Sequence, residues 1–199
     1  MNPLPKQIIS IIGFIFILLM IFYGSILPYQ KSKIFINGMS LLQSGRIRNV
    51  NDFEKTILDI FKAKSPIGQE EIIRHFGSYF ISLISQNKNK DFTNYLMDLI
   101  RPYYEQILNR GKGLSFNQDL YIFGNLNLVA YDQTKESKYL EEAEKYFMIS
   151  YNLGSKRPQA LYGLFDVCRF KNDMECMKKI GEEILSYWPN ETEIKKFLE

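Results

Sequence analysis

The sequence has very few of the histidine and cysteine residues from which metal sites and disulfide frameworks are built. Its 199 residues include one histidine, His75, and two cysteines, Cys168 and Cys176. A single histidine cannot form a histidine-based metal site, and two cysteines do not make a disulfide scaffold. His75 lies within a helical pattern, which favours a structural or surface role. We therefore expect no metal site and no cofactor.

The motifs of phosphate and acyl-transfer chemistry are also missing. A phosphate-binding loop has the pattern GxxxxGK[ST] between a strand and a helix, and the Gly-Lys-Gly at residues 111–113 has neither this spacing nor a strand before it. No serine lies in a GxSxG turn. Glu141, Glu142 and Glu144 are spaced so that most of them fall on the polar, solvated face of a helix. We expect no catalytic residues and a protein that is not an enzyme.

A large excess of charge of either sign is absent as well. The chain has 25 basic and 22 acidic residues, a net charge of +3, spread along its length. Proteins that bind nucleic acid usually carry a basic face or stripe. We expect no nucleic-acid partner. Aromatic residues, in contrast, are frequent, with 15 Phe and 13 Tyr, which indicates a packed core rather than disorder.

Charge is missing altogether from residues 8–27, which read IISIIGFIFILLMIFYGSIL. At about 1.5 Å per residue, a helix of this length matches a hydrocarbon core of roughly 30 Å. A cleaved signal peptide has a shorter apolar region of about 7–15 residues, followed by a small-residue cleavage site. We predict an uncleaved transmembrane anchor over residues 1–33. The residues expected at the membrane interface are Tyr23, Tyr29, Lys31 and Lys33.

The charges beside this anchor leave its orientation open. Lys6 and the amino group precede the apolar run, and more basic residues follow it than precede it. The positive-inside rule applied to this count places the following domain in the cytoplasm. Long domains, however, translocate largely regardless of such charges.

The remainder of the chain lacks the alternation of a half-buried strand and shows helical periodicity instead. Apolar residues recur at three- and four-residue spacing, as in Phe53, Ile57 and Ile60. We predict an all-α fold in which a juxtamembrane segment over residues 34–50 leads into a helical domain over residues 51–199.

Proline, glycine and capping residues suggest where these helices begin and end. Asn51, three residues before Glu54, is expected to cap the first of them. Pro102 lies inside a helical pattern and is expected to kink that helix or split it into two, and Gly111 is expected to end it. The later helices are predicted over residues 117–132, 137–153, 158–171, 173–188 and 191–198.

The short turns between these helices indicate antiparallel hairpins stacked on one another. The last hairpin, PQALYGLFDVCRFKNDMECMKKIGEEILSYWPN, resembles a tetratricopeptide repeat, with its "ND" on the Gly-Asp turn of the motif. In the preceding hairpin, Gly124 suits the small position of the first helix. Its second helix has the small–aromatic–small series Ala143, Phe147 and Ser150. The resemblance implies a solenoid in which small residues let helices approach closely and the aromatic fills the gap to the next hairpin.

The last hairpin departs from the repeat motif at four positions, and the hairpin before it carries seven extra residues, YDQTKES. Where the motif prefers Gly, Tyr, Ala and Phe, the sequence has Phe165, Cys168, Met177 and Gly181.

A narrower resemblance covers most of residues 50–190. The stretches FEKTILDIFKAKSPIGQEEIIRHFGSYF, YLEEAEKYF and SKRPQALYGLFDVCRFKNDMECMKKIGEEILSYWPN are similar to the C-terminal tetratricopeptide-like tail of O-antigen ligase/polymerase-like membrane proteins of bacteria. Those proteins span the membrane many times, whereas one span is predicted here. Their glycan-transfer activity is therefore not carried over, and no catalytic residue maps onto this sequence. The resemblance implies a role in surface-glycan assembly and a helical domain outside the cytoplasm.

Two interpretations are open for the cysteines, which flank the turn of the last hairpin eight residues apart. Cys168 suits a small core residue. Alternatively, Cys168 and Cys176 form a disulfide across the hairpin, which requires an oxidising compartment and Cα atoms within about 7 Å.

The function that these observations favour is a non-catalytic, membrane-anchored scaffold that binds a membrane-associated protein partner. An accessory subunit or fragment of an O-antigen ligase/polymerase-like glycan transferase is the alternative. A partner is expected on exposed side chains of the first helices of successive hairpins. By helical position, the candidate contacts are Asn127, Tyr131, Tyr162, Asp166 and Arg169. The two tyrosines also suit a simpler role, packing between hairpins.

Overall fold

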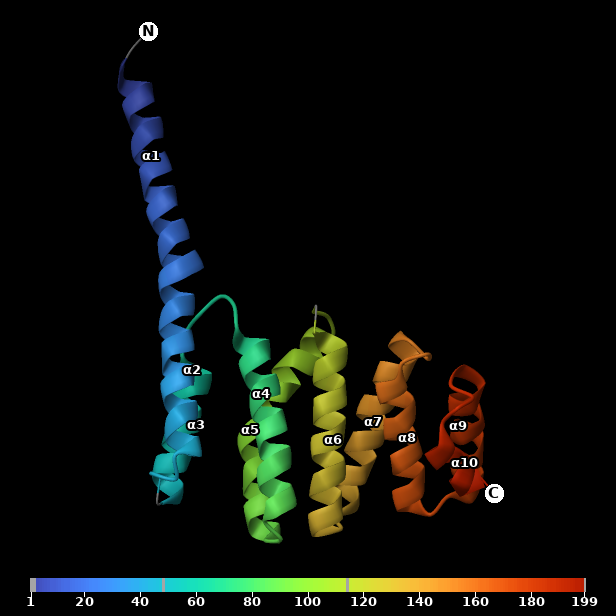
Figure 1. Ribbon diagram of the computed structural model, residues 1–199. Helices are drawn as coiled ribbons and strands as arrows, with labels where there is room; N and C mark the ends of the chain where they lie inside the picture. Colours follow the sequence, from blue (N-terminus) through green and yellow to red (C-terminus); the bar gives the residue numbers. More distant parts are fainter. Residues whose placement is uncertain (1–2, 48, 114, 199) are drawn as a thin grey trace. The chain divides into compact units, whose positions relative to one another are not determined.

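The computed structural model describes residues 3–47, 49–113 and 115–198, and these residues contain helices and no strand (Figure 1). This confirms the predicted all-α fold. The chain forms two compact units, Met1–Ile72 and Ile73–Glu199. The elements are α1 (Pro3–Ile21), the π-helical η1 (Phe22–Ile26), α2 (Leu27–Gln43), α3 (Val50–Lys62), α4 (Gln69–Gln86), α5 (Lys90–Arg110), α6 (Phe116–Thr134), α7 (Ser137–Leu153), α8 (Pro158–Lys171), α9 (Met174–Tyr187) and α10 (Thr192–Leu198).

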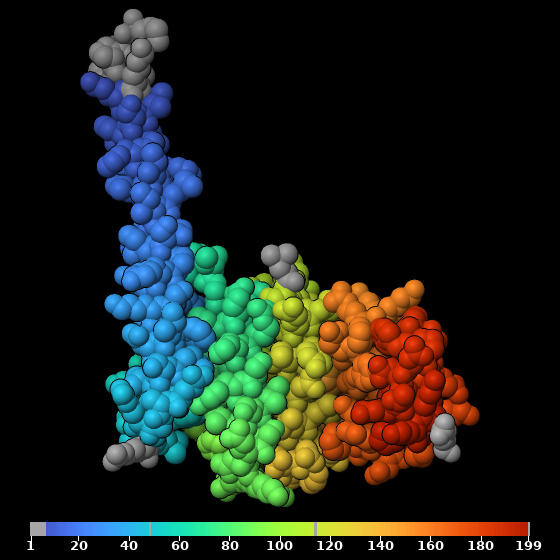
Figure 2. All heavy atoms as spheres, viewed as in Figure 1, coloured from blue at the N-terminus to red at the C-terminus, as the bar shows by residue number. Residues whose placement is uncertain are grey.

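The first unit begins with one long helix, because α1, η1 and α2 follow one another without a break. Its apolar side chains project outward (Figure 2). Ile9 and Phe14, for example, are 70% and 62% exposed. A soluble protein would bury such residues. The structure therefore has, as predicted, one helix near the N-terminus that is long and apolar enough to span a membrane.

Within this unit, α2 packs closely against α3. A Cβ at Gly38 of α2 would lie only 2.5 Å from Cδ1 of Ile60, so glycine permits this approach. Asn49 caps α3, since its side chain accepts a hydrogen bond from the backbone N–H of Asp52 at 2.7 Å. The cap lies two residues before the predicted Asn51, so that prediction is wrong. Asn51 lies instead in the first turn of the helix.

The side chain of Lys31 is buried within the protein, whereas it was predicted among the interfacial residues that follow the apolar run. Its side chain is 3% exposed, and Nζ donates a hydrogen bond to Oε1 of Gln69. The reason is that α2 continues beyond the apolar run and is covered by α3 and the segment that follows it. Tyr23 and Tyr29 are exposed, as an interfacial position requires.

The helices predicted in the second half of the chain are found to within two residues at each end. Gly111 ends α5 in the left-handed conformation, with φ of 64°. Pro102, however, does not split α5, which is one helix through this position. Ile100 and Tyr104, on either side of the proline, are fully buried. This burial holds both halves in place and offsets the cost of about 3 kcal/mol of a proline inside a helix.

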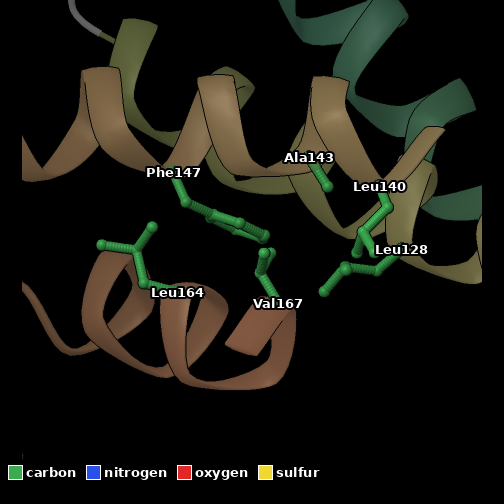
Figure 3. Packing of buried hydrophobic residues seen from close by; sticks show 6 residues of the cluster. All are labelled: Leu128, Leu140, Ala143, Phe147, Leu164 and Val167. Atoms are coloured by element: carbon green, nitrogen blue, oxygen red, sulfur yellow. The ribbon is translucent and has the colours of Figure 1, made fainter. Parts of the chain in front are cut away.

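Phe147 of α7 lies between two glycines of neighbouring helices. A Cβ at Gly124 of α6 would lie 2.7 Å from the ring, and a Cβ at Gly163 of α8 would lie closer still. The ring therefore packs against the backbone of both helices, and we name this arrangement the Phe147 contact. Figure 3 shows the cluster around it. The buried members besides Phe147 are Leu128, Leu140, Ala143, Leu164 and Val167.

The last hairpin has its own core and a disulfide. Cys168 and Cys176 are bonded, with Cα atoms 5.7 Å apart. Asn172 adopts the left-handed conformation at the turn, and Asp173 caps α9 by accepting a hydrogen bond from the backbone N–H of Cys176 at 3.0 Å. Both cysteine interpretations therefore hold in part, because Cys168 is also buried in the core. The other members of this core are Leu161, Phe165, Met177, Ile184 and Ile194.

Candidate partner-binding surface

Three of the predicted contact residues form a stripe along α8. Tyr162, Asp166 and Arg169 are separated by four and three residues, which places them on one side of the helix. The first two are half-buried and Arg169 is exposed. The stripe thus combines an aromatic ring with a negative and a positive group, none of them enclosed by the core.

Asp166 and Arg169 form an ion pair, with Oδ1 and Nη2 2.9 Å apart. Partial burial raises the pKa of Asp166, and the positive charge of Arg169 partly opposes this. Both side chains keep exposed surface, 38% for Asp166 and 46% for Arg169. Because an exposed pair of this kind adds about 0–1 kcal/mol to stability, it has no large structural role.

The two predicted tyrosines pack against neighbours and remain half-exposed. The ring centroid of Tyr162 lies 6.4 Å from that of Trp188, and Tyr131 lies 5.4 Å from Phe170 in an edge-to-face arrangement. Tyr131 thereby joins α6 to α8. The simpler expectation, that these rings pack between hairpins, is therefore met for Tyr131, whereas Tyr162 packs within the last hairpin. Their exposed edges are still available for contact.

Two cations accompany the rings that join α6 to α8. Nζ of Lys135 lies 5.6 Å from the centroid of Tyr131 and 6.0 Å from that of Phe170. Cζ of Arg169 lies 5.7 Å from the centroid of Phe170. Tyr131 is thus connected to the α8 stripe through Phe170. We define the contact surface as Tyr131, Tyr162, Asp166, Arg169 and Phe170.

Asn127 is not part of this surface, which corrects the prediction that its side chain is exposed. It is fully buried, and its amide donates a hydrogen bond to the carbonyl of Phe123 at 2.8 Å. Asn127 lies one turn after Gly124, on the side of α6 that faces Phe147 and the core. A partner cannot reach this side chain.

Tyr121 and Asn125 of α6 are the residues that the sequence reasoning missed. They lie 41 residues before Tyr162 and Asp166 and are half-buried in the same way. The Nδ2 of Asn125 donates to the backbone carbonyl of Tyr121 at 3.0 Å. The sequence contained a signal for them. Once Gly124 is assigned to the contact between helices, the positions three residues before it and one residue after it lie beside that contact on the surface of α6.

The acidic residues of α7 are not a uniformly solvated face. Glu142 pairs with Arg101 of α5 and is only 28% exposed. Glu144 pairs with Lys171 of α8, with Oε2 and Nζ 2.6 Å apart. The side chain of Glu144 nevertheless stays 41% exposed, and Glu141 is exposed as well. The expectation therefore holds for these two residues and is wrong for Glu142, because α5 flanks α7 and brings Arg101 to it.

A buried polar group lies between α4, α5 and α6. The side chain of Asp119 is 1% exposed and lies 3.8 Å from Nη1 of Arg74. Burial raises the pKa of the nearby Tyr104 well above its usual range, and the charge of Asp119 raises it further. A Cβ at Gly77 would overlap the Tyr104 hydroxyl, so this oxygen packs against α4. The group lies in the core, where Asp119 is 1% exposed and Tyr104 is fully buried.

No group of three or more His, Cys, Asp or Glu that could hold a metal ion occurs among the described residues. The contact surface defined above is therefore the candidate site. It has aromatic rings, the ion pair of Asp166 with Arg169, and Lys135 as a further cation nearby. In comparisons with known proteins, no family model, no curated protein and no solved structure matched this chain.

Proposed function

We propose that this protein is a membrane-anchored scaffold that binds a membrane-associated protein partner through the contact surface on α6 and α8. The observation that carries the proposal is the α8 stripe with its neighbouring rings. Tyr and Arg are the residue types in which the binding energy of protein interfaces is concentrated, and here they are held half-exposed on packed helices.

The helical-repeat part of the proposal is supported by the Phe147 contact. A tetratricopeptide-like solenoid requires small residues where helices approach and an aromatic residue between hairpins, and Gly124, Phe147 and Gly163 meet that requirement. Stacked hairpins present a continuous surface of first helices to a ligand. A role in surface-glycan assembly rests only on the resemblance to O-antigen ligase/polymerase-like tails and stays a prediction.

The Cys168–Cys176 bond favours a domain outside the cytoplasm, because disulfides persist in oxidising compartments and are rare in the cytosol. Cells can be lysed in denaturant with a maleimide–polyethylene glycol, with and without prior reduction. We expect no mass shift without reduction and two additions after it. Two additions without reduction would place the domain in a reducing compartment.

The anchor is tested by membrane extraction of the full chain. Carbonate washing should leave it in the membrane fraction, and Ile17→Arg should hinder insertion by about 2.5–3.5 kcal/mol on translocon scales. Release of the unaltered chain by carbonate would contradict the spanning helix.

The partner surface is tested with a photo-crosslinking amino acid at Tyr162 in the full chain, in cells. One discrete crosslinked product is expected, and Asp166→Ala combined with Arg169→Ala should remove it while leaving the melting temperature nearly unchanged. The matched control removes the exposed pair Lys178 and Glu182 of α9, and should keep the product. A product that survives the first double change excludes the α8 stripe as the contact.

A further inference from the structure

One end of the second unit is basic. Residues 107–118 and 145–165 contain five cations and no acidic residue. All five are exposed. They come from the end of α5, from α7 and from the two loops that lead into α6 and α8, and Figure 1 shows both loops at the same end of this unit. We name as the basic end the residues Arg110, Lys112, Lys145, Lys156 and Arg157.

A shallow cleft of about 310 Å³ shows that the end of α5, the start of α6 and α7 meet here, and Lys145 is the member of the basic end that lines it. Leu108 of α5 and Phe116 of α6 line one side, and Lys145 and Leu153 of α7 line the other. Leu153 is 51% exposed and lies three residues before Lys156. The basic end therefore combines exposed cations with exposed apolar surface.

Three cations of the basic end, in two loops, are not neutralised by carboxylates in the described part of the chain. In the described part of the chain, Lys112, Lys156 and Arg157 have no ion pair, and Lys156 instead lies 5.6 Å from the ring centroid of Tyr187. At the opposite end of the same unit, by contrast, two lysines are paired with carboxylates. Lys135 lies 2.8 Å from Asp132, and Lys138 lies 2.6 Å from Glu136.

An acidic group borders the basic end on the side of α9. Glu183, which lies beside α7, accepts a hydrogen bond from the hydroxyl of Tyr151 at 2.9 Å. The two ends therefore differ in the number of acidic residues near their cations and in how many of those cations form ion pairs.

We propose that the basic end binds the anionic lipid headgroups of the membrane that holds α1. Each Lys or Arg close to an anionic bilayer gains about 1 kcal/mol, which corresponds to about fivefold in binding. The side chain of Leu153 can enter the interface between them. Because the anchor keeps the domain next to the bilayer, the membrane is present at high effective concentration and is the occupant favoured over a soluble polyanion. The inference rests on the anchoring proposed above and is independent of the partner surface on α8.

The full chain in nanodiscs provides the test. Hydrogen–deuterium exchange is measured for peptides covering residues 109–113 and 153–157, in nanodiscs of phosphatidylcholine alone and with about one third phosphatidylglycerol. We expect slower exchange of both peptides with the anionic lipid, and loss of this protection in about 0.5 M salt, where surface charges are screened.

Two triple variants distinguish binding by the basic end from a general effect of removing positive charge from the domain. Lys112→Gln, Lys156→Gln and Arg157→Gln together should lower the ratio of docked to free domain by about a hundredfold, at about fivefold for each cation. Lys88→Gln, Lys90→Gln and Lys135→Gln remove the same charge at the opposite end and should leave the protection unchanged.

The outcomes distinguish the two proposals. Equal exchange in both lipids, or protection that the first triple variant keeps, would overturn the docking of the basic end. A chain that does not enter nanodiscs at all would instead overturn the anchor.

Discussion

The hairpins α6–α7 and α8–α9 are held together by different means. In the first, the ring of Phe147 packs on the backbone at Gly124 and, across to α8, at Gly163. In the second, the place of this ring, 34 residues later, is occupied by Gly181, and a disulfide joins the two helices at their turn. The side chains of Ile194 and Leu198 from α10 lie over Gly181.

The difference shows how one helical pattern can be stabilised by shape or by a covalent bond. A ring that lies against two glycine backbones leaves no room for a further methyl group, so the first hairpin is sensitive to volume. The second hairpin has flexible side chain ends at the equivalent place and is sensitive to redox state instead. Four substitutions test this distinction, each on the full chain in detergent, followed by circular dichroism during urea unfolding.

Removing the ring should have the largest effect. Phe147→Ala leaves a cavity between three helices, and we expect it to lower the free energy of unfolding by about 3–5 kcal/mol. Phe197→Ala serves as the control, because Phe197 is 46% exposed and should contribute far less. If both variants lost the same amount, the Phe147 contact would not be the centre of this core.

Opening the disulfide should come next. The bond closes a short loop, and the chain-entropy model gives a loss of about 2–3 kcal/mol on reduction. Urea midpoints with and without dithiothreitol measure it. The variant with both Cys168 and Cys176 changed to alanine should show the same midpoint in the two conditions. An unaltered chain that is equally insensitive to reductant would show that the bond adds nothing to stability.

Adding a methyl group beside the ring should have a smaller effect. Gly163→Ala forces the ring of Phe147 or α8 to move, and overpacking of this kind costs about 1–3 kcal/mol. This cost exceeds the gain of about 1 kcal/mol that alanine brings to a helix interior. A net increase in stability would mean that the helices separate easily at this place.

The same substitution in the second hairpin should have the smallest effect and the opposite sign. A Cβ at Gly181 would lie 3.2 Å from Cδ1 of Leu198, at the far end of a flexible side chain, and 3.3 Å from Cγ2 of Ile194, so a shift of a few tenths of an ångström accommodates it. We expect Gly181→Ala to raise the free energy of unfolding by about 0.5 kcal/mol, since the gain in helix propensity is only partly offset. A loss above 1 kcal/mol would remove the distinction between the hairpins.

The helices themselves were predictable from the sequence, because apolar spacing and turn residues are local signals. The contact of Gly124 with Phe147 was predictable too, through the spacing of the repeat motif. Gly163 was not, since it lies two residues before Phe165, where that motif expects its glycine. Its role depends on how α8 is rotated against α7, which no local pattern determines.

The incorrect predictions for Asn127, Lys31 and Glu142 have the same origin, namely that local patterns do not determine which surfaces become covered. Asn127 reads as a polar surface residue, yet the face of α6 on which it lies is covered by other helices. Lys31 and Glu142 read as solvated charges, and each has a partner more than 35 residues away in the sequence, Gln69 and Arg101 respectively. Burial of a polar side chain is decided by such distant partners, so periodicity alone assigns it incorrectly.

If α1 spans the membrane as we propose, the unbroken course of α1, η1 and α2 makes the spanning segment and α2 parts of one continuous helix. Beyond the apolar run, the 17 residues of α2 extend about 25 Å, with α3 packed against them. Spanning helices change tilt when bilayer thickness changes, and a tilt of about 10° would swing the far end of α2 by about 4 Å. A local thinning or thickening of the bilayer is thereby converted into a displacement of the first folded contacts outside it.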